Sequence, residues 1–176
     1  MNERTGRARP GGRPRPAKRE AILNVPEFLT AAAELEMVAA MLYETMAELS
    51  PDSGMVRHLR ALADDEARHA NAITIGKRDH QEMSDAFGRI DLEDGELQRL
   101  IMDGNAFRAS LKPGFILTEG LKKMLKIERR FEKIHIAASI EITNPALKRL
   151  FETLTKNDRS HIATLNNLLE SRLNSG

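Results

Sequence analysis

The chain has 176 residues, of which 41% are apolar and 30% charged, so it is long enough for one well-buried core and a single domain. It contains no cysteine, which excludes disulfides, thiolate zinc sites, cysteine-held iron–sulfur clusters and a thiol nucleophile. A bound metal ion would therefore use oxygen and nitrogen ligands. No apolar run approaches the roughly 20 residues that span a bilayer, and no secretory leader is recognisable, so we expect a cytoplasmic protein with no membrane segment.

The first residues form a basic arm that is poor in apolar side chains. Residues 1–20 carry seven basic and two acidic side chains, together with three prolines and three glycines. Such a composition buries too little apolar surface to order the chain, so we expect a disordered arm over residues 1–22 and a folded domain over residues 23–176. A solvated tail is the favoured interpretation of the arm, and contact with nucleic acid is the alternative.

The rest of the chain predicts four long helices. The first begins near Asn24, a good N-cap, and ends at the Ser50-Pro51 break. The others run from the turn at 51–54 to about Gly76, from near Thr118 to the break at 144–145, and from there to about Leu173. The connection over 77–117 has turn signals at 94–95, 103–104 and 113–114, and one short helix is expected around 96–102. The short turns make two antiparallel hairpins, which the long connection joins into a bundle with one long crossover.

The two halves of the sequence repeat one pattern of residues at a constant offset of 92. The matched pairs are Glu36 and Glu128, Glu66 and Asp158, and His69 and His161. Steps of three and four residues along the predicted helices place all six on stripes that are otherwise largely apolar. A single acid-x-x-His match occurs by chance, but two matches in the same register, each with a glutamate 30 residues upstream of the acid, indicate one shared site.

Carboxylates on apolar stripes need a partner for their charge. An ionised carboxylate in a core is costly unless it is paired or bound to a metal. Two divalent cations would balance four converging carboxylates, and each histidine would add a nitrogen ligand; such ligands suit hard or borderline ions such as iron or manganese. The alternative is pairing with cations, although most candidates point toward solvent; they are Arg60, Arg68, Lys126, Arg129 and Arg159.

With these residues the chain resembles rubrerythrin-type members of the ferritin-like superfamily over residues 24–173. The resemblance implies an all-α fold, a ferritin-like four-helix bundle with one long crossover between the second and third helices, around two iron ions, with manganese or a mixed pair as alternatives. It implies that Glu36 and Glu128 are terminal ligands and that Glu66 and Asp158 are bridging ligands. His69 and His161 would be the nitrogen donors. Tyr43 stands where family members carry a tyrosine beside the metals, and we expect it to be catalytic.

The chain also departs from the family pattern. Asp158 stands where a glutamate is usual, and its shorter side chain leaves a second bridge that is strained, monodentate or lost. His135 replaces the counterpart of Tyr43 and is a supporting hydrogen-bond donor, an extra ligand or a core histidine. Glu132, one turn beyond Glu128, is a second candidate for an extra ligand. Because the sequence has no cysteine, we expect no cysteine-rich rubredoxin domain of the kind that rubrerythrins carry.

The resemblance implies redox chemistry with hydrogen peroxide or O₂, as peroxide reduction or ferroxidase activity, with electrons from an external donor. It also implies a homodimer. Two alternatives stay open: an iron storage or binding bundle without catalytic turnover, and a bundle whose basic arm binds nucleic acid. The sequence does not separate peroxide reduction from ferroxidase activity.

Overall fold

Within the residues that the structure describes, the chain is helical apart from one pair of short strands. The computed structural model describes the backbone of residues 20–23, 25–79, 90–93 and 95–174, and the side chains of residues 25–79, 95–172 and 174. In chain order the elements are β1 (Glu20–Leu23), α1 (Val25–Leu49), α2 (Ser53–Asp79), β2 (Ile90–Glu93), α3 (Glu96–Ser110), α4 (Leu117–Glu141) and α5 (Pro145–Leu173). The prediction of an all-α fold class is confirmed.

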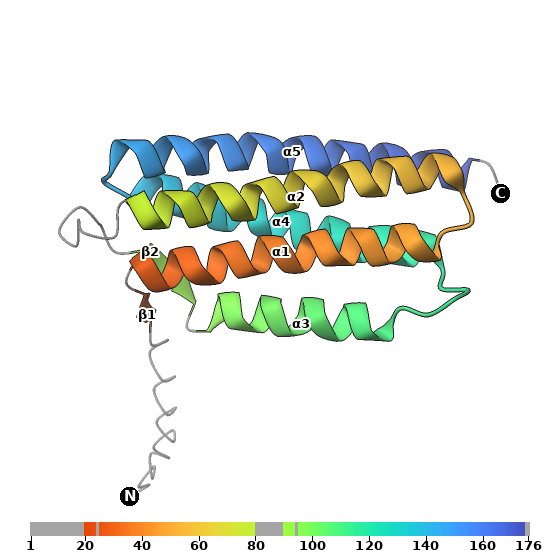
Figure 1. Cartoon of the computed structure of the whole chain (residues 1–176), viewed down its shortest axis with the longest axis horizontal. Coiled ribbons are helices and arrows are strands. Elements are labelled where there is room, and N and C mark those ends of the chain that lie inside the picture. Colours follow the sequence, from red (N-terminus) through yellow and green to blue (C-terminus); the bar gives the residue numbers. More distant parts are fainter. Residues whose placement is uncertain (1–19, 24, 80–89, 94, 175–176) are drawn as a thin grey trace, which may run out of the picture.

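The four long helices lie side by side with nearly aligned axes, as two antiparallel hairpins (Figure 1). Polar side chains fix the tight turns within the hairpins. Asp52 Oδ1 accepts the N–H of Gly54 at 2.8 Å, and Asn144 Oδ1 accepts the N–H groups of Ala146 at 2.9 Å and Leu147 at 3.1 Å, so each caps the second helix of its hairpin. The predicted helix limits are confirmed, except that α2 continues past Gly76 to Asp79.

The helix α3 is longer than predicted and lies along the outside of α1 (Figure 1). The expected turn at 103–104 is wrong, because the helix continues through both residues to Ser110. A Cβ atom on Gly104 would lie 2.6 Å from Val38 Cγ1 of α1. Glycine at this position therefore lets α3 approach α1 closely, although in the sequence it has the signal of a turn.

The strand pair was not predicted. The strands β1 and β2 are antiparallel, with Glu20 opposite Glu93 and Leu23 opposite Ile90. Residues 20–22, assigned to the disordered arm, therefore belong to a strand, whereas residues 1–19 lie outside the described part of the chain. The strand β2 packs on α4 and is followed almost directly by α3, so the pair lies at the end of the bundle where α1 and α3 begin (Figure 1).

One apolar core runs through the bundle, with large buried side chains such as Phe28, Phe131 and Phe151. The helix α1 is buried on two sides, since it contacts α2 and α4 and also α3. Within the described residues, no helix is both long and apolar enough to cross a membrane.

Candidate metal centre

Four carboxylates meet inside the bundle, one from each long helix. They are Glu36 of α1, Glu66 of α2, Glu128 of α4 and Asp158 of α5, and no more than 1% of any of them is exposed. Their depth follows from the amphipathic pattern, because each replaces an apolar residue on the inward stripe of its helix. The sequence prediction that these acids converge is confirmed.

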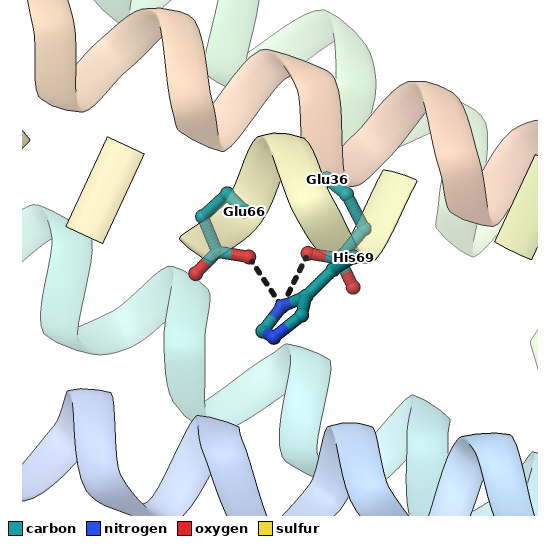
Figure 2. A group of neighbouring side chains, drawn as sticks. All are labelled: Glu36, Glu66 and His69. Carbon is teal, nitrogen blue, oxygen red and sulfur yellow. Dashed lines mark hydrogen bonds and ion pairs between the residues drawn. The ribbon is translucent and has the colours of Figure 1, made fainter. Parts of the chain in front are cut away.

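Glu66 lies between two groups of ligand atoms. Its Oε2 is 3.1 Å from His69 Nδ1, which is also 3.8 Å from Glu36 Oε2. Figure 2 shows these three side chains pointing toward one another. On the other side, Glu66 Oε1 is 2.7 Å from His161 Nδ1, which is 3.6 Å from Glu128 Oε2. In each group of three, one ligand atom per residue lies within 4.8 Å of the others, so each group could hold a metal ion and Glu66 is shared.

Asp158 is equally buried but is held differently from Glu66, its partner in the repeat. Its Oδ2 lies 2.8 Å from His135 Nδ1, and the other ring nitrogen of His135 lies 3.0 Å from Glu36 Oε1. His135 therefore connects Asp158 to Glu36, and Asp158 is in neither of the two three-residue groups. The two halves of the centre are thus similar but unequal.

Tyr43 lies beside the centre, as predicted. Its side chain is fully buried, and its hydroxyl donates a 2.5 Å hydrogen bond to Glu128 Oε1 across the bundle. Burial and the charge of Glu128 raise the pKa of Tyr43 well above its usual value, so the phenol keeps its proton. His135, its counterpart in the repeat, also reaches across the bundle, in the opposite direction, to Glu36.

Two residues outside the ligand groups contact the Nε2 atoms of His69 and His161, and the sequence interpretation missed both. Asn157 Nδ2 lies 2.9 Å from His69 Nε2, and Asp65 Oδ2 lies 3.5 Å from His161 Nε2. Asp65 and Asn157 are themselves 92 residues apart, so the repeat that found the ligands also contained this signal. Each comes from the opposite hairpin to its histidine, and such contacts orient an imidazole toward a metal.

Among the described residues, the partners of the four central carboxylates are histidines rather than lysines or arginines. Glu132 is not part of either group; it lies at the edge of the bundle and accepts a 2.7 Å hydrogen bond from Arg159. All five cations considered as partners are exposed: Arg60, Arg68, Lys126, Arg129 and Arg159. Three of them pair with other acids, which are Glu44, Asp65 and Glu132. In the described part of the chain, no lysine or arginine forms an ion pair with the four central carboxylates.

The pKa values of the buried histidines and glutamates show how strongly the centre attracts positive charge. Burial by itself lowers the pKa of each histidine, but the neighbouring carboxylates outweigh it. The resulting pKa is about 9 for His69, about 10 for His135 and about 11 for His161. Burial raises the pKa of Glu128 to about 7; it acts the same way on Glu36, but the neighbouring Glu66 and two histidines lower that pKa to about 2.

Several buried polar atoms of the centre have no partner in hydrogen-bond geometry, although some lie close to each other, such as Glu66 Oε1 and His161 Nδ1 at 2.7 Å. Among the described residues these atoms are both carboxylate oxygens of Glu36, Glu66 Oε1, Glu128 Oε2, Asp158 Oδ1 and His161 Nδ1. Buried polar atoms nearly always have a partner, so unpaired atoms concentrated in one place need an explanation. All six belong to residues predicted as ligands, and bound cations would satisfy them, so the donor set fits a metal.

Metal binding should release protons and strengthen as the pH rises. At neutral pH the raised pKa values keep His69 and His161 protonated, whereas a metal ligand must be a neutral imidazole. Between about pH 6 and pH 9, affinity should therefore increase about tenfold per pH unit for each proton displaced. Competition titrations at several pH values and a pH-indicator dye would measure both effects. Affinity that did not change over this range would contradict displacement of histidine protons.

Comparison with models of protein families, with curated proteins and with solved structures gave no match. The interpretation of the centre therefore depends on its own geometry and chemistry.

Proposed function

We propose that this protein is a di-iron carboxylate protein that carries out redox chemistry with hydrogen peroxide or O₂, as peroxide reduction or ferroxidase activity. The main support is the buried centre, in which four carboxylates and two inward-facing imidazoles from four helices leave six polar atoms without a hydrogen bond. Two divalent cations would balance the four carboxylates and satisfy these atoms.

The two groups suggest which residues would hold each ion. Glu36 and His69 would bind one ion, Glu128 and His161 the other, and Glu66 would bridge them. Oxygen-rich ligands with one nitrogen per ion and no thiolate suit iron or manganese. The spacing of the ligands resembles that of rubrerythrin-type proteins, which favours iron. Bound iron(II) would supply one electron per ion, which together are the two electrons that reduce hydrogen peroxide to water.

The surrounding residues suit this reaction. Reduction of hydrogen peroxide to two water molecules consumes two protons, which solvent would supply; the Tyr43 hydroxyl keeps its own proton and is a buried hydrogen-bond donor in direct contact with Glu128. Asp65 and Asn157 would keep the histidine rings oriented, and the apolar core around the centre would exclude bulk water. Because the chain has no cysteine and so no cysteine-held iron–sulfur cluster of its own, the proposal includes an external electron donor. The expected cytoplasmic location and homodimer belong to the same proposal.

The proposal is tested by metal content and by the response to peroxide. Protein purified from iron-supplemented cells should contain about two iron ions per chain, and one equivalent of peroxide should oxidise both ions of the anaerobically reduced protein. Tyr43→Phe should keep the iron but slow this oxidation on the order of tenfold or more, because the buried O–H donor is lost. Iron analysis and stopped-flow absorbance would measure the two quantities separately.

A well-folded protein without stoichiometric metal would contradict the di-iron assignment. Two bound ions that peroxide and O₂ leave reduced would contradict the redox role alone.

A further inference from the structure

The outer surface of α4 forms a basic groove with α3. The groove has a volume of about 570 Å³, and five cationic side chains of α4 line it: Lys123, Lys126, Arg129, Arg130 and Lys133. Because Glu128 of the same helix points into the core, the groove lies on the opposite face of α4 from the metal centre. It is therefore separate from the proposed redox function.

Within the described residues, the cations of the basic groove have no acidic partner in ion-pair contact. In the described part of the chain, none of the five forms an ion pair, although Lys122 of the same helix pairs with Glu119 at 2.8 Å. Asp103 of α3 is the acidic residue among those that line the groove. Concentrated unpaired positive charge favours an anionic ligand.

The arrangement of these cations favours a linear polyanion. Lys123, Lys126, Arg130 and Lys133 follow one another at steps of three and four residues, which place them along one face of α4. At 1.5 Å per residue this row is about 15 Å long. Charges spread along a row match successive phosphates of a nucleic-acid strand, whereas a single phosphate would need them to converge on one point.

An aromatic ring and apolar side chains also line the groove. Phe107 of α3 is partly exposed there, with the ammonium of Lys123 4.3 Å from the centre of its ring, and Leu100 and Ile127 lie in the same groove. Proteins bind single-stranded nucleic acids with cations along the backbone and aromatic rings on which bases stack. A duplex keeps its bases stacked inside, where Phe107 would not reach them.

The basic arm joins the fold at one end of this groove. Seven basic residues precede β1 in the sequence, and β1 pairs with β2, which packs on α4 and leads into α3 (Figure 1). The basic segment at the start of the sequence thus joins the fold near the basic groove. We propose that the basic groove binds single-stranded nucleic acid, with phosphates along the cations of α4 and a base against Phe107.

The test measures the affinity of the full chain for a fluorescent single-stranded oligonucleotide of mixed sequence, at several salt concentrations. The triple variant Lys126→Glu, Arg130→Glu, Lys133→Glu should bind at least tenfold more weakly. The slope of log affinity against log salt concentration should become shallower by about 0.7 for each phosphate that the variant no longer neutralises. The matched control Lys148→Glu, Arg149→Glu, Lys156→Glu reverses three exposed charges of α5 and should bind as the unaltered protein does. Circular dichroism and iron content would verify the fold of each variant.

Further binding experiments distinguish single-stranded nucleic acid from other polyanions. Phe107→Ala should weaken binding of the oligonucleotide several-fold but leave binding of polyphosphate, which has no bases, unchanged. Equal weakening for both polyanions, or equal affinity for duplex and single strand, would overturn the proposal. So would an affinity that falls when residues 1–19 are deleted but not in the triple groove variant. None of these outcomes depends on the redox activity, so the two proposals can fail separately.

Discussion

Replacing Glu66 with glutamine is expected to remove both metal ions from the protein. Glu66 contributes an oxygen to each of the two ligand groups, Oε2 toward His69 and Oε1 toward His161, so its loss affects both. The fold should survive, because burial raises the pKa of this carboxyl in the metal-free protein and glutamine has the shape of the protonated acid. Metal analysis and circular dichroism of the purified Glu66→Gln protein would measure both quantities.

The matched control for this variant is Asp64→Asn. Asp64 lies two residues away on the same helix, is exposed and is in neither ligand group, so its replacement should leave the metal content unchanged. If Glu66→Gln retained one ion per chain, the carboxylate would not be shared. If it retained two, the assignment of the centre would be wrong.

Removal of the metal is expected to lower the melting temperature by about 15–30 °C. A ligand that binds only the folded state stabilises it by about 4 kcal/mol when its free concentration is a thousandfold above the dissociation constant, so two ions give about 8 kcal/mol. For a domain of this size each kcal/mol corresponds to about 2–4 °C. Thermal unfolding with iron(II) and with a chelator, both under anaerobic conditions, would measure the difference.

Thermal unfolding of the Glu66→Gln protein with iron(II) and with the chelator is the control for this prediction. That variant should melt at one temperature with or without the chelator, since it has no metal to lose. A chelator-dependent shift of similar size in Glu66→Gln would mean that metal stabilises the protein at some other site.

The parts of the fold that the sequence predicted depend on local signals. Prolines and capping side chains such as Asp52 and Asn144 mark where the long helices begin, and apolar spacing marks which face is buried. The six candidate ligands were predicted in the same way, because acids on apolar stripes are conspicuous and the repeat places them in register. Local chemistry therefore explained the bundle and most of its centre.

The parts that were missed depend on contacts between distant segments. Gly104 has the same local signal whether it makes a turn or admits a neighbouring helix, and only the packing against Val38 distinguishes the two. The strand pair joins residues 20–23 to residues 90–93, and nothing in either segment indicates the other. Asp65 and Asn157 were overlooked because their contacts cross from one hairpin to the other.

The repeat of 92 residues also has an architectural consequence. A hairpin that paired with an identical copy of itself would have to place the same residue on both sides of the symmetry axis. This chain contains both hairpins, so each related pair of positions is free to diverge. Three pairs around the centre have done so: Tyr43 and His135, Asp65 and Asn157, and Glu66 and Asp158. Covalent joining of two similar halves thus gives the chain two chemically distinct sides of one centre, which a symmetric assembly of hairpins could not provide.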